Sequence, residues 1–199
     1  MKSVIATVSL LALMVAAPAW AADTGTGAAT GEPQGQQALN QQDRQFINEA
    51  AEGGRAEVEM GKVAAERSDN PAVREFGRWM ETDHTMANDA LDYIVHRAGV
   101  TPPSTIDPHD QTALESLQKL HGAAFDQKYV PMQVEGHEQT IALFQKEEQS
   151  GENPHLKRYA EHTMPMLRAH LAEAQDLSRL PGMASTRSYS GSSAAPATR

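Results

Sequence analysis

Apolar residues recur at helical spacing through the middle of this chain, and this periodicity limits the fold more than any other feature. Between about residues 39 and 180 they return every three or four positions, with almost no alternating pattern of the strand type. We therefore predict an all-α domain. The pattern predicts long helices over residues 39–67, 70–98, 123–149 and 153–180, and a short extra helix over 108–121 in the middle connection.

Two of the long helices begin with the same dipeptide. Asn70-Pro71 and Asn153-Pro154 each place an N-capping side chain before a proline, which the first helical position tolerates. The two sites are 83 residues apart, so the chain reads as two related helical hairpins, although chance similarity between amphipathic hairpins would look the same. A single hairpin leaves an apolar face exposed to water, and we expect the two to pack as an antiparallel four-helix bundle.

The amino terminus has the features of an export signal. Lys2 precedes an apolar run over residues 4–17, and Ala19-Trp20-Ala21 has the small-x-small pattern of a cleavage site. We predict a signal peptide over 1–21 and a periplasmic or otherwise extracytoplasmic mature protein; an uncleaved membrane anchor would need a longer apolar run. Compositions poor in apolar residues predict a disordered linker over 22–38 and a disordered tail over 181–199, leaving a domain over 39–180.

The charge and the cysteine content limit the binding partners and the kinds of site that this chain can have. The chain has no cysteine, which excludes disulfides and thiolate metal sites. Its formal net charge of -9 argues against nucleic acid and anionic membrane surfaces as partners. No stretch after the signal peptide is apolar enough to span a bilayer, so any association with the envelope would be peripheral. The sequence does not identify a protein partner.

Five blocks carry a resemblance to a known family. They lie in order along residues 46–174: Ala56-Glu57-Val58-Glu59-Met60-Gly61-Lys62, Met80-Glu81-Thr82-Asp83-His84-Thr85, Gly122-Ala123-Ala124-Phe125-Asp126, Gln133-Val134-Glu135-Gly136-His137 and Pro165-Met166-Leu167-Arg168-Ala169-His170-Leu171. In these the chain resembles the bacterial domain of unknown function 4142 family, described as predicted outer-membrane or periplasmic proteins with a ferritin-like bundle. The resemblance implies a fold and an envelope location, and no activity.

Each long helix carries a polar side chain among its apolar ones. The spacing of these side chains from core positions predicts that they point inward. They are Glu57, His84, Asp126, His137 and His170. One interpretation is a ferritin-like metal site, because helices hold oxygen and nitrogen donors in fixed positions. The other is a buried polar network in which Glu57 or Asp126 pairs with an imidazole and fixes the register of the helices.

The metal interpretation itself divides in two. A di-iron or di-manganese site uses Glu-x-x-His pairs, and only Glu81-Thr82-Asp83-His84 has that spacing. A copper site would use softer donors, and His162, Met166 and His170 follow one another at four-residue spacing, opposite Met80 and His84. Methionine in a helix is also an ordinary core residue.

Enzymatic motifs are missing from the sequence. It has no Gly-rich phosphate loop, no nucleophile elbow and no cofactor fingerprint, so any enzyme of this sequence would depend on a metal. The sequence therefore favours a non-enzymatic structural or stress-related binding protein. The alternative is a metal-binding redox or storage protein for iron, manganese or copper.

Overall fold

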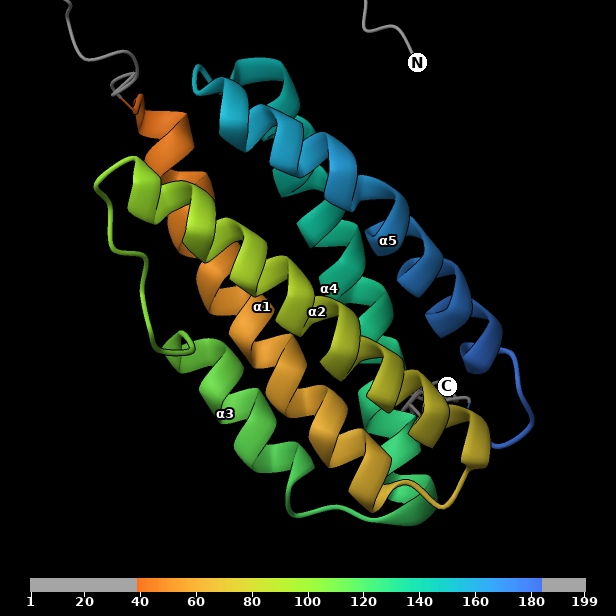
Figure 1. The fold of residues 1–199 in the computed structure, drawn as a ribbon. Coiled ribbons are helices and arrows are strands. Elements are labelled where there is room, and N and C mark those ends of the chain that lie inside the picture. The colour runs from red at the N-terminus through yellow and green to blue at the C-terminus, as the bar shows by residue number, and fades with distance from the viewer. Residues whose placement is uncertain (1–38, 184–199) are drawn as a thin grey trace, which may run out of the picture. The chain divides into compact units, whose positions relative to one another are not determined.

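The structure, a computed structural model, describes residues 39–183, which form five helices and no strand. The predicted signal peptide and linker, and the tail from residue 184, lie outside these residues and stay predictions. The predicted all-α class is confirmed for the described part of the chain (Figure 1). The helices are α1 (Gln41–Arg67), α2 (Pro71–Arg97), α3 (Pro108–Leu117), α4 (Gly122–Ser150) and α5 (Pro154–Ser178).

Side-chain caps fix where most helices begin. The Asn70 side chain accepts from the backbone N–H of Ala72, and the Asn153 side chain accepts from those of His155 and Leu156. Both Asn-Pro starts therefore form as predicted. At α1, Asn40 and Asp43 accept from each other's backbone N–H, which makes a capping box.

One predicted helix end is wrong. The short helix was expected to reach residue 121, but α3 ends at Leu117 and α4 begins at Gly122. The chain reverses between them through Gly122, whose φ of +54° lies in the left-handed region. Glycine adopts this conformation without a steric penalty. The residues after Leu117, which the periodicity had assigned to the short helix, form the reversal instead.

The four long helices pack against one another, and α3 lies along α1 (Figure 1). The tightest approach joins α1 and α2 at two glycines. A Cβ on Gly61 would lie 2.6 Å from the carbonyl oxygen of Gly77, and a Cβ on Gly77 would lie 2.7 Å from that of Gly61. Only glycine permits this contact, which fixes the spacing of α1 and α2 in the half of each helix next to the α1–α2 turn.

The apolar core divides into two clusters with a polar layer between them. One cluster includes Met60, Phe76 and Tyr129, and the other includes Phe46 and Leu91. On α2, α4 and α5, polar residues lie between the segments that belong to the two clusters, and on α1 a polar residue follows Ala56, where one of the clusters begins. These residues are Glu57 on α1, His84 on α2, Gln133 and His137 on α4, and His170 on α5.

Within residues 39–183, no helix combines the length and the apolar character that crossing a bilayer requires.

Candidate metal centre

Three histidines from three helices meet in the polar layer. His84, His137 and His170 are all buried, with 5%, 1% and 0% of their surface exposed. Their ring centroids lie 5.4 to 5.7 Å apart. One ring nitrogen of each lies within 4.8 Å of a ring nitrogen of the other two. Buried imidazoles brought this close have the donor type and the spacing of a metal site.

Two of the rings are oriented by hydrogen bonds from one ring nitrogen to a protein acceptor. Nδ1 of His137 donates to the backbone carbonyl of Gln133 at 2.9 Å, and Nε2 of His170 donates to the Asp83 carboxylate at 3.0 Å. Each ring therefore carries its hydrogen on the bonded nitrogen and a lone pair on the other one. Metal-ligating histidines are characteristically held in this way by a carbonyl or a carboxylate.

The other ring nitrogens lack protein partners. Among the described residues, no protein atom hydrogen-bonds to Nε2 of His84, Nε2 of His137 or Nδ1 of His170, although all three nitrogens are buried. Buried polar atoms in native proteins nearly always have a partner, because an unpaired one costs about 1–3 kcal/mol. Three such atoms in one cluster therefore require an explanation.

The three imidazoles are held neutral. Burial is the main cause that lowers the pKa of each ring, to about 4 for His137 and His170 and well below the usual range for His84. The other rings of the cluster lower the pKa of His84 and His170 further, and Asp83 partly opposes the shift at His170. A neutral imidazole offers the lone pair that a metal needs.

Aromatic residues close one side of the cluster. The indole ring of Trp79 lies edge-on to the His170 imidazole, with centroids 4.9 Å apart, and Phe76 lies 6.3 Å away. Both belong to α2, one and two turns before His84. Trp79 is 39% exposed, so it covers His170 while it remains in contact with solvent.

Glu57 belongs to the same layer but bonds to no imidazole. Its carboxyl oxygen accepts from Nε2 of Gln133 at 2.8 Å, and the backbone carbonyl of Gln133 in turn orients His137. Burial raises the pKa of Glu57 to about 7, although the bond from Gln133 opposes this. The side chain is half-buried and lines a cavity.

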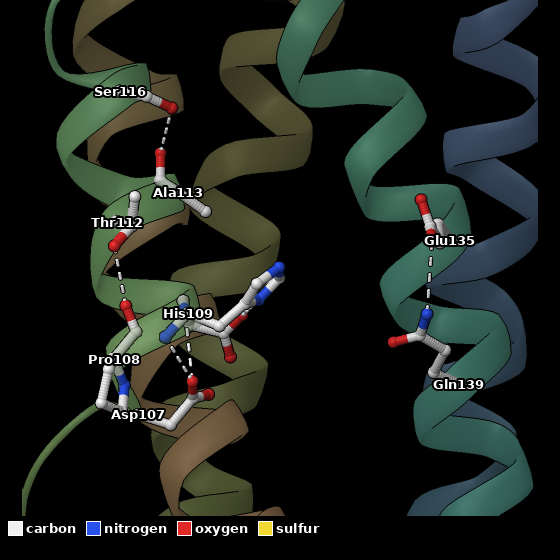
Figure 2. Close-up of polar contacts among 9 residues, drawn as sticks. Asp107, Pro108, His109, Thr112, Ala113, Ser116, Glu135 and Gln139 are labelled. Carbon is white, nitrogen blue, oxygen red and sulfur yellow. Dashed lines mark hydrogen bonds and ion pairs between the residues drawn. The ribbon is translucent and has the colours of Figure 1, made fainter.

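This cavity has a volume of about 600 Å³ and reaches the surface between α3 and α4. Its inner wall includes Glu57, His84 and Gln133, and its outer wall includes exposed residues of α3 and α4 such as His109 and Glu135. Figure 2 shows side chains that belong to the outer walls, among them His109 and Thr112 on α3 and Glu135 and Gln139 on α4. Of the three histidines, only His84 lines the cavity.

Two of the predicted carboxylates lie away from the cluster. Asp126 is buried on α4, but its neighbours are Ser68, Asp69 and Arg74 at the α1–α2 turn; its pKa is raised mainly by burial. Glu81 is only half-buried and contributes to the negative charge around Lys62. No hydrogen bond joins Glu57, Asp126 or Glu81 to an imidazole within residues 39–183, so the network expected around Glu57 or Asp126 does not form.

The predicted copper set is brought together only in part, because His84 and His170 belong to the cluster and His162 does not. His162 is exposed, and its Nδ1 donates to the carbonyl of Arg158 on its own helix. Met166 lines the cavity, and Met80 is packed in the apolar core. The four-residue spacing does not keep all of these side chains on one face of the helix, because His162 and His170 are eight residues apart and the helix turns about 80° over that distance.

Sequence reasoning missed two residues that shape the site. Gln133 links Glu57 to His137, and its position four residues before His137 was a signal for a contact on one helix face. Trp79 packs on His170 from another helix, and no local spacing could reveal a contact between residues 91 positions apart.

The fold and the cluster define an all-helical domain with a buried triple histidine at its middle. A family model described as "Domain of unknown function (DUF4142)" matches residues 28–177, and the chain belongs to this family, as its five blocks suggested. Among solved structures it is similar to a DUF305 fragment from Deinococcus radiodurans, with a TM-score of 0.63 and 16% identity over 71% of this chain and 99% of that one. This likeness concerns the fold alone. A search of curated proteins found no match.

Proposed function

We propose that this chain is a metal-binding protein of the bacterial envelope, in which His84, His137 and His170 hold one transition-metal ion. One observation carries the proposal: each of the three buried imidazoles keeps a ring nitrogen without a protein partner, and these rings lie within ligand distance of one another. Coordination would satisfy all three nitrogens at once. The leader-like segment over residues 1–21 supports the envelope location.

The donor set favours some metals over others. Imidazole nitrogen suits zinc, copper, nickel and iron, whereas manganese prefers carboxylate oxygen. Affinity for such a site rises along the divalent series to Cu²⁺ and is lower for Zn²⁺, which imidazole nitrogen also suits. Copper and zinc are therefore the first ions to test. A carboxylate-bridged di-iron site fits poorly, because Glu57 bonds to Gln133 and Glu81 faces Lys62 instead.

The arrangement of the helices agrees with this proposal. We infer an antiparallel four-helix bundle of the ferritin-like type, in which α1, α2, α4 and α5 each place one part of the polar layer between the same two apolar clusters. Bundles of this type build their metal sites from side chains on facing helices. The proposed site differs from the carboxylate-rich ones of that class in being made of nitrogen donors.

One observation also supports a second, structural function. His137 and His170 are each anchored by a hydrogen bond, and Trp79 and Phe76 pack around His170. A polar layer held in this way could fix the register of the helices in a non-enzymatic structural or stress-related binding protein. In that case the three unpartnered ring nitrogens would not bind a metal.

Metal analysis of the purified protein tests the proposal. Protein isolated from the envelope fraction should carry about one equivalent of a transition metal, or should take up one equivalent of Cu²⁺ or Zn²⁺ after treatment with a chelator. His84→Ala should lose this metal while keeping its helical circular dichroism, because a lost ligand weakens the site and leaves the core packed.

His162→Ala is the matched control. It removes an imidazole from the same domain, but from an exposed position outside the cluster. It should bind the metal like the wild type. Metal-free wild-type protein that also fails to take up added Cu²⁺ or Zn²⁺ would refute the metal function and leave the structural one.

A further inference from the structure

The histidine cluster is buried, so an ion needs a way in. His137 and His170 have no more than 1% of their surface exposed, and Trp79 and Phe76 pack beside His170. The cavity between α3 and α4 is the feature that joins the surface to the polar layer, because His84 belongs both to its inner wall and to the cluster. The unpartnered Nε2 of His84 is the buried ligand atom at this junction.

The size of the cavity suits a hydrated ion. A volume of about 600 Å³ corresponds to about 20 water molecules at 30 Å³ each. A divalent ion with six waters would need about a third of this space by the same measure. The cavity is therefore large enough to hold a hydrated divalent ion.

The charges on the walls favour a cation. Four carboxyl groups line the cavity, against a single lysine, Lys128; they are Glu49, Glu57, Asp110 and Glu135. The carboxyls influence one another across the space: the pKa of Asp110 is raised to about 6, mainly by burial and Asp107, with a contribution from Glu57. Low-dielectric walls of one charge sign raise the local concentration of the opposite ion.

Glu57 occupies the inner end of this path. Its carboxyl is held by Gln133 on one side, and the cavity borders the other. We infer that the cavity between α3 and α4 is the route by which a hydrated divalent metal cation reaches the three histidines, and that Glu57 is the carboxylate that the cation meets before them. This inference rests on the proposed metal function and adds the path and the positioning residue.

Gly53 offers a direct way to block the route. It lines the cavity, and a Cβ placed on it would meet no atom within 4 Å. A larger side chain at this position would therefore extend into open space without displacing the core. Gly53→Phe places an aromatic ring inside the cavity and narrows it, and Gly53→Ala adds one carbon while removing the same backbone freedom. Asn48→Phe places the same ring on an exposed position of α1 outside the cavity.

Trp79 provides the signal for the measurement, because its ring lies 4.9 Å from that of His170. Chelator-treated protein is mixed with Cu²⁺ in a stopped-flow instrument, and the quenching of tryptophan fluorescence gives association and dissociation rates. Gly53→Phe should slow association by about tenfold or more, since binding then needs a local opening. Dissociation should slow by the same factor, so the affinity and the one-ion stoichiometry stay unchanged.

Glu57→Gln tests the charge without filling the cavity. The amide oxygen can still accept from Gln133, but the negative charge is lost, and association should slow by about tenfold at low salt and less at high salt. If Gly53→Phe does not fold, this isosteric variant still tests whether the cation passes Glu57 on its way to the histidines. Gly53→Ala and Asn48→Phe should load at rates close to the wild type.

Two results would overturn the inference, and they are distinguishable. Wild-type loading rates in both Gly53→Phe and Glu57→Gln, with one Cu²⁺ still bound, would mean that the ion uses another path while the metal function stands. Failure of the wild type to bind any Cu²⁺ would remove the metal function together with the route.

Discussion

Two buried polar clusters in this domain are built on opposite principles. Near the start of α1, Asp43 accepts hydrogen bonds from the backbone N–H groups of Asn40, Glu152 and Asn153, so its carboxylate ties the start of α1 to the α4–α5 connection. In the middle of the domain, the three histidines leave one ring nitrogen each without a protein partner. In the first cluster both carboxylate oxygens of Asp43 accept from backbone N–H groups, which is a structural role. The second keeps lone pairs available, which is the property of a binding site.

The cluster at the start of α1 should therefore dominate stability. Asp43→Ala removes the acceptor of three backbone N–H groups, and we expect it to lower the free energy of unfolding by about 3 kcal/mol. Urea unfolding followed by circular dichroism measures this. Asp43→Asn, which keeps one oxygen acceptor, should lose less. An Asp43→Ala protein as stable as the wild type would show that this end of the domain is not held as described.

The histidine cluster should behave in the opposite way. In metal-free protein, His84→Met replaces a ring whose buried nitrogen lacks a partner by an apolar side chain, and we expect a gain of about 1.5 kcal/mol in unfolding free energy. The same variant should lose the stabilisation that Zn²⁺ gives the wild type. A comparable loss of stability in the metal-free variant would mean that His84 contributes a structural contact.

The smallest expected effect is a change of stability with pH that arises in the cluster around Asp43. Glu147 lies beside Asp43 and accepts from Gln42; burial and the Asp43 carboxylate raise its pKa to about 7, from 4.5 in the unfolded chain. The folded protein thus binds the proton more tightly, and stability should fall as pH rises from about 4.5 to about 7 and then level off.

Glu147→Gln should remove this dependence. The full shift would correspond to about 3 kcal/mol, but relaxation and water penetration around the ionised carboxylate reduce this cost, and we expect about 1 kcal/mol. The variant should gain this stability over the wild type at pH 8 and none at pH 4, as measured by urea unfolding at both values. An equal difference at the two pH values would contradict the assignment.

Local chemistry predicted the helices well. The caps at Asn70 and Asn153 act within two or three residues of themselves, so the sequence contains everything needed to place them. The reversal at Gly122 was missed because it depends on how α3 and α4 join, and helical periodicity continues through the residues that the turn requires.

The candidate site shows where a helical wheel loses information. The wheel placed His137 and Asp126 on one face of α4, and both are buried. It does not separate positions along the axis, and eleven residues correspond to about 16 Å of helix. Asp126 therefore belongs to the end of the domain near Ser68, whereas His137 belongs to the middle. The hydrogen bond between Glu57 and Gln133 depends on the packing of α1 against α4, and residue spacing within one helix does not predict this packing.

The central claim is that three particular ring nitrogens are metal ligands, and nuclear magnetic resonance of the histidine rings tests it most directly. One equivalent of Zn²⁺ added to ¹⁵N-labelled, metal-free protein should shift the resonances of Nε2 of His84, Nε2 of His137 and Nδ1 of His170. The nitrogens bonded to Gln133 and Asp83 should keep their hydrogens, and the exposed His162 should not respond. Unchanged resonances of the three buried rings in the presence of Zn²⁺, or a response confined to exposed histidines, would contradict the account.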